Sequence, residues 1–118
     1  MGVQYCASST VAENAVLAHP ATLGSVPTNA NNQDVVPMGS VGVRQARRLL
    51  DNARLVVAIE LLVAAEAVEV AEATDLAPAT RALYDRIRAV VPPLTTDRPL
   101  GADVERLAAS VADLAAAG

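Results

Sequence analysis

The 118-residue sequence predicts an all-α fold, a segment of a long-helix bundle that is incomplete without partner helices. Four stretches carry apolar residues at helical spacing, and none shows the alternation of apolar and polar residues that is typical of a strand. Although 53% of the residues are hydrophobic, 25 are Ala and 17 are Val, and neither Phe nor Trp occurs. Because such small side chains bury little apolar area each, we expect neighbouring chains to supply part of the burial.

The first helix is expected over residues 1–18, because Gln4 to Ala18 contains neither Gly nor Pro. The dipeptide His19-Pro20 ends it, since a residue before proline is disfavoured in the α region. Residues 19–39 then form a loop with three Pro, two Gly and three Asn. A loop of this length is uncommon inside a compact domain unless it is functional, so it is predicted to be an active-site-type loop.

A long core helix is expected over residues 40–73, with Ser40 as its N-cap. At about 1.5 Å per residue this helix spans roughly 50 Å, which is too long for a small globular domain. Its middle, Leu55 to Ala65, is apolar on nearly every face, and a helix that is hydrophobic all round must be surrounded by other helices. We therefore expect the chain to belong to a larger bundle or oligomer.

Two shorter helices complete the fold, over residues 78–91 and 101–117. Pro78 is favoured at a first helical position, and Pro92-Pro93 ends the first of the two helices. Its apolar stripe consists of Leu83, Ile87, Val90 and Val91. The last helix has apolar residues at amphipathic spacing, namely Val104, Leu107, Ala108, Val111, Leu114 and Ala115.

Charge and composition argue against several classes of partner. The net charge of −4 has the wrong sign for a phosphate backbone, so we expect no nucleic acid. The most hydrophobic stretch, Leu55–Ala71, is interrupted by Glu60, Glu66 and Glu69, so we expect no membrane insertion. The single cysteine, Cys6, cannot form an internal disulfide, and the first residues lack the pattern of a signal peptide. A cytoplasmic protein is expected.

Isolated polar residues offer little chemistry. His19 could act as a general base, but without a spaced carboxylate pair it offers no metal site, and a structural or solvent-facing role is commoner. Cys6 lacks a partner His and is equally consistent with a buried, inert thiol. Four arginines gather early in the long helix, near Asp51: Arg44, Arg47, Arg48 and Arg54. They either bind an anion or form a solvated or interchain ion-pair face, which is the commoner arrangement.

The acidic residues of the long helix suggest two environments. Glu60 lies inside the apolar run, and a buried carboxylate must be paired or protonated. We favour a pair with an Arg of another helix over a functional acid. Glu66, Glu69 and Glu72 recur at every third position and most simply form a solvated face.

The stretch from residue 28 to residue 39 carries the sharpest functional signal. Several amides, which both donate and accept hydrogen bonds, come just before a long helix whose N-terminus favours negative charge. This arrangement favours an amide-lined pocket for an amino-acid carboxylate. The alternative is that the Asn side chains simply satisfy the loop backbone.

Seven short motifs occur in order along the chain: AEN, LAHPA, NNQDVV, MG, ARR, VVPPL and DRPLG. In this order, and over nearly the whole chain, they closely resemble the C-terminal part of the aromatic amino acid ammonia-lyases and aminomutases, the histidine, phenylalanine and tyrosine enzymes.

The resemblance implies a homotetramer of long helices in which each active site contains residues of more than one chain. Such enzymes use an electrophilic methylidene-imidazolone group, formed from an internal Ala-Ser-Gly, to eliminate ammonia, and aminomutases add the amine back at the β carbon. By resemblance, Asn32 and Gln33 line the substrate pocket. Asn29 is the third candidate, because aminomutases have Asn where plant phenylalanine enzymes usually have Glu. No catalytic residue, cofactor site or metal site is assigned within the chain.

The sequence also departs from the family. Histidine enzymes usually have Gln-Glu-Asp where this sequence has Asn32-Gln33-Asp34, and the uncharged Gln33 is more similar to the phenylalanine, tyrosine or aminomutase branch. No Ala-Ser-Gly occurs, and the nearest string is Ala7-Ser8-Ser9. Tyr5 and Tyr84 do not match the catalytic tyrosines of the family. The methylidene-imidazolone group is therefore expected only in a missing upstream part.

These observations predict the C-terminal fragment of a lyase or aminomutase acting on phenylalanine, tyrosine or histidine, inactive by itself. One alternative is the small subunit of a split lyase, which requires a neighbouring reading frame that contains Ala-Ser-Gly. Another is a non-catalytic helical oligomerisation module, which predicts stable self-association without such a partner. The expected partners are copies of the chain or a larger lyase subunit, and an aromatic amino acid once the site is complemented.

Overall fold

The computed structural model describes residues 2–33 and 35–116. In these residues the structure contains four α-helices, one short 3-10 helix and no strand, so the all-α prediction is confirmed. The elements are α1 (Gly2–Leu17), η1 (Ala21–Gly24), α2 (Gly39–Val70), α3 (Pro78–Val90) and α4 (Gly101–Ala116). Each helix lies within a few residues of its expected bounds, and residues 1 and 117 of the expected helices lie outside the described part.

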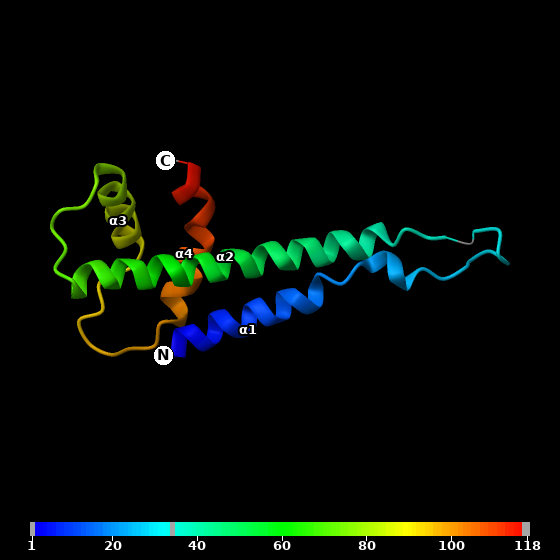
Figure 1. Cartoon of the computed structure of the whole chain (residues 1–118), viewed down its shortest axis with the longest axis horizontal. Coiled ribbons are helices and arrows are strands. Elements are labelled where there is room, and N and C mark those ends of the chain that lie inside the picture. Colours follow the sequence, from blue (N-terminus) through cyan, green and yellow to red (C-terminus); the bar gives the residue numbers. More distant parts are fainter. Residues whose placement is uncertain (1, 34, 117–118) are drawn as a thin grey trace.

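The long helix α2 is the central element of an elongated molecule that measures 68 × 30 × 19 Å. α1 runs antiparallel to α2, whereas α3 and α4 pack on the C-terminal half of α2 (Figure 1). The loop between α1 and α2 lies at the opposite end of the long axis (Figure 1). None of the described helices has the length and hydropathy needed to span a membrane.

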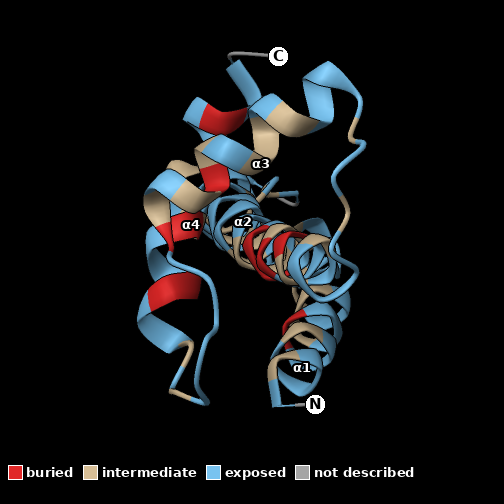
Figure 2. Cartoon of the chain, turned by 90° about the vertical axis from the view of Figure 1, so that its left-hand side faces the viewer, coloured by how far each residue is buried: buried red, intermediate tan, exposed pale blue. Residues whose placement is uncertain are grey.

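The hydrophobic core lies where the second half of α2 meets α3 and α4 (Figure 2). Its buried members are Ala58, Ile59, Leu62 and Ala65 of α2, Ile87 and Val91 of α3 and its C-cap, and Val104, Leu107 and Leu114 of α4. On α2, Leu62 lies four residues after Ala58 and three after Ile59, and Ala65 follows three residues later, which places all four on one side of the helix. α1 contributes only partly buried side chains to this cluster, from Val3 and Ala7.

A buried carboxylate joins the start of α4 to the segment that precedes it. Asp103 is 2% exposed and forms ion pairs with Arg98 and Arg106. Asp103 lies in the first turn of α4, where the helix dipole favours a negative charge. Because both arginines reach it, the charge of the buried carboxylate is compensated.

Arg88 of α3 pairs with two of the three glutamates predicted to form a solvated face, and that prediction is wrong for the partly buried Glu66. Nη1 of Arg88 donates to Glu66 at 2.9 Å, and its Nε lies 3.3 Å from the Glu69 carboxylate. The guanidinium lies over the ring of Tyr84, 5.5 Å from its centroid, and the Tyr84 hydroxyl donates to Glu69. Both glutamates therefore join α2 to α3, while Glu69 and Glu72 are exposed.

The environment of Arg88 also affects its charge. Burial lowers the pKa of the guanidinium, but hydrogen bonds to Tyr84 and Glu66 and the negative charge of Glu66 oppose this effect and outweigh it. The pKa of Arg88 is raised above its ordinary value as a result. Arg88 therefore remains charged in its partly buried position between α2 and α3.

The start of α2 differs from the prediction. Met38 occupies the N-cap position with a left-handed backbone, at φ 50° and ψ 32°, and no side chain caps the helix. The Met38 carbonyl accepts hydrogen bonds from the N–H groups of Val41 and Gly42, both at 3.0 Å. Ser40 lies inside the first turn, so the predicted Ser40 cap is wrong.

The end of α2 is set by backbone geometry that the side-chain pattern does not reveal. Glu72 adopts a left-handed conformation at φ 48°, and the N–H of Ala73 donates to the Val68 carbonyl at 3.1 Å. This is the hydrogen bond of a Schellman motif, which commonly ends a helix. The helix therefore stops at Val70, earlier than the predicted end at residue 73.

One face of α2 is left uncovered by the rest of the described chain. We call it the open face; its exposed residues are Val43, Ala46, Leu50, Ala53, Val57 and Ala64. Successive members are three, four or seven residues apart, so they follow the spacing of a surface against which another helix packs. Other helices of the chain thus cover the side of α2 that carries the core residues. The open face is also apolar, but it is exposed to solvent.

Candidate functional site

The loop between α1 and α2, residues 18–38, ends in a small hairpin that we call the tip, residues 28–33. Thr28 and Gln33 form an isolated antiparallel bridge, in which the Thr28 N–H donates at 2.9 Å and the Gln33 N–H at 3.3 Å. Nearer to the helices, the Val36 N–H donates to the Ser25 hydroxyl oxygen at 2.8 Å. These bonds hold the two arms of the loop together at the bridge and on the side of it that faces the helices.

Three consecutive residues of the tip have left-handed backbones. Their φ angles are 53° for Asn29, 52° for Ala30 and 66° for Asn31. Asn tolerates this conformation, but an Ala there costs roughly 1 kcal/mol. The N–H of Asn32 donates to the Asn29 carbonyl at 3.0 Å and closes the turn. Strain of this kind is common at functional sites.

The three site residues predicted from the sequence all lie in this tip. Asn29, Asn32 and Gln33 are exposed, and the structure brings them together at the end of the molecule farthest from its core (Figure 1). Asp34, which follows them in the motif, lies outside the described residues. The arrangement offers several amide donors and acceptors to a ligand or to another chain.

Thr28 is a residue of the tip that the sequence analysis missed. Its hydroxyl donates to Oε1 of Gln33 at 3.1 Å. The sequence did contain one signal for Thr28: a hydroxyl side chain five residues before the predicted site residue Gln33, on the other side of a short turn. This spacing indicates a contact only when the backbone bridge that pairs Thr28 with Gln33 is known.

The other polar candidates do not gather into a site. His19 and Cys6 are exposed and far apart in the fold, so the buried thiol weighed for Cys6 is wrong. Arg48 pairs with Glu13 of α1, and Arg54 pairs with Asp51 at 3.1 Å. Within residues 2–33 and 35–116, no group of His, Cys, Asp and Glu side chains could hold a metal ion.

Glu60 was expected to be buried against an Arg of another helix, but it is exposed. No ion pair joins it to an Arg in the described part of the chain. It borders a shallow groove between α1 and α2, together with Val3, Ala7 and Val63. The prediction of burial is wrong for the chain by itself, because this side of α2 is only partly covered by α1.

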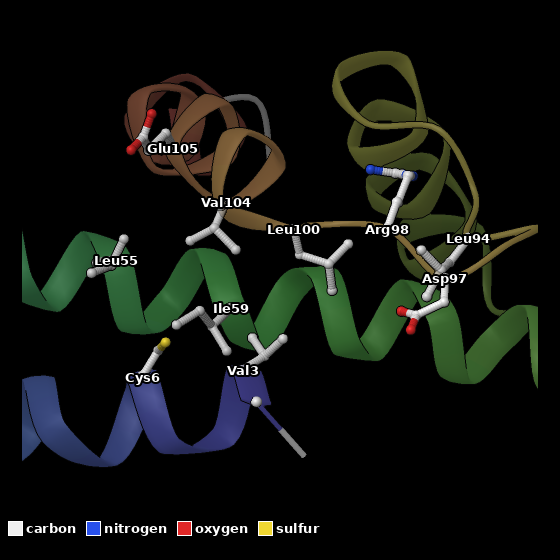
Figure 3. Close-up of a pocket in the computed structure, with 12 residues that line it drawn as sticks. Val3, Cys6, Leu55, Ile59, Leu94, Asp97, Arg98, Leu100, Val104 and Glu105 are labelled. Atoms are coloured by element: carbon white, nitrogen blue, oxygen red, sulfur yellow. The ribbon is translucent and has the colours of Figure 1, made fainter.

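A cavity of about 630 Å³ lies between the start of α1, α2 and residues 94–105. Figure 3 shows Val3, Cys6, Ile59, Leu100 and Val104 around it. Most of its lining is apolar, and its charged residues are Asp97, Arg98 and Glu105. It lies at the start of α1, whereas the tip follows the end of α1, so the predicted site residues do not line it.

The chain does not fit the methylidene-imidazolone group that the resemblance implies. Its nearest string, Ala7-Ser8-Ser9, lies inside α1, where the backbone is helical and the Ser9 hydroxyl donates to the Cys6 carbonyl at 3.0 Å. The third position is Ser9, where the family has the Gly from which the group forms. Residues 7–9 are therefore not suited to form that group.

Comparisons with known proteins agree with one another. Residues 1–89 match the family described as aromatic amino acid lyase. A histidine ammonia-lyase of Symbiobacterium thermophilum is 51% identical over 108 residues, which are 92% of this chain and 21% of that protein. The chain thus spans about a fifth of the length of the curated relatives that it matches.

Solved structures show the same helical arrangement. The tyrosine aminomutase from Streptomyces globisporus superposes with a TM-score of 0.90 at 43% identity, over 97% of this chain and 22% of that one. A phenylalanine aminomutase of Pantoea agglomerans gives a TM-score of 0.88 at 36% identity, over 94% of this chain and 22% of that one. These proteins are named for different substrates and reactions.

Proposed function

This chain belongs to the aromatic amino acid lyase family, and on that premise we propose that it is the C-terminal helical part of an ammonia-lyase or aminomutase. The tip supplies Asn29, Asn32 and Gln33 to a substrate pocket that residues outside this chain complete. The observation that carries the proposal is the position of these three amides, exposed together on a hydrogen-bonded hairpin.

The role of the tip is to bind and orient the substrate. Carboxamides are well suited to a zwitterionic amino acid, because one group both donates to a carboxylate and accepts from an ammonium. Precise placement of a bound substrate contributes to catalysis even when the chain that places it holds no acid, base or nucleophile for the reaction. The electrophile is supplied by residues outside this chain, and the chain by itself is inactive.

The open face of α2 is proposed to pack against helices of a complementary lyase segment or of further copies of the chain. Apolar side chains at helix-packing spacing support this proposal. We expect Val57→Glu, in the middle of the open face, to abolish the association of the chain with itself or with a complementary lyase segment. Size exclusion and light scattering measure this association. Val70→Glu, an exposed valine outside the open face, is the matched control and leaves association unchanged. Equal association of both variants contradicts the proposal.

The substrate is proposed to be phenylalanine, tyrosine or histidine. The uncharged Gln33 favours an aromatic ring without an imidazole, and Asn29 favours the aminomutase reaction, in which the amine returns to the β carbon. The relatives are named for histidine elimination and for tyrosine or phenylalanine amine migration. Product analysis separates the two reactions, because elimination yields an arylacrylate and migration yields a β-amino acid.

The test is an activity assay of the purified chain, alone and complemented. Complementation uses a chimera in which the chain replaces the matching segment of the Symbiobacterium thermophilum histidine ammonia-lyase. The chain alone is expected to release no arylacrylate from any of the three amino acids, whereas the chimera is expected to be active. Arylacrylate formed by the chain alone overturns the proposed inactivity. An inactive, correctly assembled chimera favours a non-catalytic oligomerisation module.

Substitutions in the tip test the role of its amides. Because each loses a hydrogen bond to a charged substrate, Asn32→Ala and Gln33→Ala should lower kcat/KM of the chimera by roughly ten- to a hundredfold. Asn31→Gly is the control, since it removes a neighbouring amide and keeps the left-handed backbone. Activity that is equally sensitive to all three substitutions contradicts a specific role of Asn32 and Gln33.

A further inference from the structure

Thr28 and Gln33 face each other across the tip. The backbone bridge pairs them directly, and directly opposed residues of an antiparallel pair place their side chains on the same side. The Thr28 hydroxyl is therefore within reach of the Gln33 carboxamide and donates to its Oε1 at 3.1 Å. Both residues are exposed, so this bond forms at the surface that the tip presents.

This hydrogen bond distinguishes the two ends of the Gln33 carboxamide. The terminal torsion of a Gln is broad and roughly two-fold, so an unheld carboxamide presents its oxygen or its NH2 group to a ligand. When Oε1 is engaged by the hydroxyl, Nε2 and its two protons point away from Thr28. The tip then presents a hydrogen-bond donor at this position.

The backbone around the pair supports a fixed geometry. The turn between the two residues is closed by the bond from the Asn32 N–H to the Asn29 carbonyl, at 3.0 Å. Beyond Gln33, the bond from the Val36 N–H to the Ser25 hydroxyl anchors the returning arm of the loop. The backbone of both residues is therefore held in place before any substrate binds, which lowers the entropy lost on binding.

We propose that Thr28 is a positioning residue that orients the Gln33 carboxamide so that its NH2 group donates to an acceptor oxygen of the amino acid substrate. This inference rests on the proposed function, in which Gln33 lines the substrate pocket. It adds a direction to that contact: the pocket recognises an oxygen of the substrate through Nε2 of Gln33, because the Thr28 hydroxyl engages Oε1.

The first test is a nuclear magnetic resonance measurement on the full 118-residue chain. In the unaltered protein, the Cδ and Nε2 resonances of Gln33 are expected at chemical shifts that differ from those of a free Gln side chain, because Oε1 accepts the Thr28 hydroxyl. Thr28→Val keeps the branched shape but removes the donor, so these signals should move to free-Gln values. Thr28→Ser should restore the original shifts. Unchanged Gln33 signals in Thr28→Val, with backbone signals of the tip intact, overturn the proposal.

The second test is kinetic and uses the complemented enzyme. Loss of one orienting hydrogen bond should raise KM about three- to tenfold in Thr28→Val with kcat little changed, and Thr28→Ser should recover the original KM. Thr22→Val is the matched control, because Thr22 is an exposed threonine of the same loop that makes no side-chain hydrogen bond in the described residues. Equal kinetics of Thr28→Val and Thr22→Val overturn the positioning role.

The two proposals fail in different ways. If Gln33→Ala leaves the kinetics of the complemented enzyme unchanged, then Gln33 does not bind substrate and the proposed function of the tip is wrong. If Gln33→Ala lowers activity and Thr28→Val does not, then the proposed function stands and only the role of Thr28 is wrong.

Discussion

The two ends of α2 contain the same kinds of side chain in opposite environments. At the core end, where α3 and α4 pack on α2, Ile59 and Leu62 of α2 are buried, and so is Leu107 of the neighbouring α4. At the tip end, where α2 meets α1 and the loop, Leu50 and Val43 are exposed although they are equally apolar. The difference shows that composition does not decide burial within this chain. Burial depends on how much of the helix the chain itself covers: α3 and α4 pack on the core end, whereas α1 covers only one side of α2 toward the tip end (Figure 1).

The polar contacts of the two ends differ in the same way. At the core end, Asp103 and Arg88 are charged groups withdrawn from water and paired there. At the tip end, Arg48 and Glu13 pair with each other, and both side chains remain exposed to solvent. Exposed pairs contribute little stability, whereas breaking a buried pair is costly. The core end is therefore expected to determine the stability of the chain, and the tip end its interactions.

The largest effect is expected from matched leucine truncations at the two ends. Leu107→Ala, at a fully buried position, should lower the free energy of unfolding by about 3 kcal/mol, because it removes buried methyl groups and leaves a cavity. Leu50→Ala, at a position that is 62% exposed, should change it by less than about 0.5 kcal/mol. Urea denaturation measures both. If both variants lose similar free energy of unfolding, then Leu50 is packed as closely as Leu107 and the comparison is wrong.

A smaller effect is expected when one charge is removed at each end. Asp103→Asn should cost about 1–2 kcal/mol, because two arginines lose their shared ionic partner at a buried site. Asp51→Asn is the matched control, since Asp51 forms an exposed pair with Arg54, and it should change stability by less than about 0.5 kcal/mol. Thermal melts at low and high salt distinguish the buried pair from the exposed pair, because salt screens exposed charges more strongly. A loss at Asp51 as large as that at Asp103 contradicts the comparison.

The smallest effect sharpens the comparison at the tip and has the opposite sign. Ala30→Gly should stabilise the protein by roughly 0.5–1 kcal/mol, because Gly adopts the left-handed backbone without a Cβ penalty. The same substitution on the open face, Ala46→Gly, should destabilise α2 by a similar amount. Calorimetry and amide exchange of the tip measure the change. Destabilisation by Ala30→Gly would show that the tip is not strained at this residue.

Much of the helical architecture could be predicted from the sequence, because it follows from local patterns. Pro78 starts α3, Pro92-Pro93 follows it, and the apolar spacing of α4 identifies Val104 and Leu107 as core residues. The ends of α2 were less predictable, since left-handed backbones at Met38 and Glu72 leave no clear pattern in the side chains. Local sequence predicts where helices form better than where they stop.

Contacts between distant residues were the main omission. The pairing of Glu66 with Arg88 joins residues 22 positions apart, and a helical wheel of α2 alone cannot reveal it. Glu60 was misassigned for the converse reason, because its apolar neighbours in sequence do not cover it in space. At the candidate site, the family resemblance located Asn32 and Gln33, but the pairing of Thr28 with Gln33 required the bridge.

The contacts of Glu13 have a consequence for how the loop can vary. Glu13 of α1 accepts hydrogen bonds from both Arg48 and Asn52, which are one turn apart on α2, and Asn52 also donates to Asn14 at 2.9 Å. A slide of α1 by one helical turn, about 5.4 Å, would break all three bonds. The two ends of the loop are therefore anchored at a constant separation. New side chains can therefore be introduced in the tip while α1 and α2 keep their alignment, which makes this loop suitable for directed diversification.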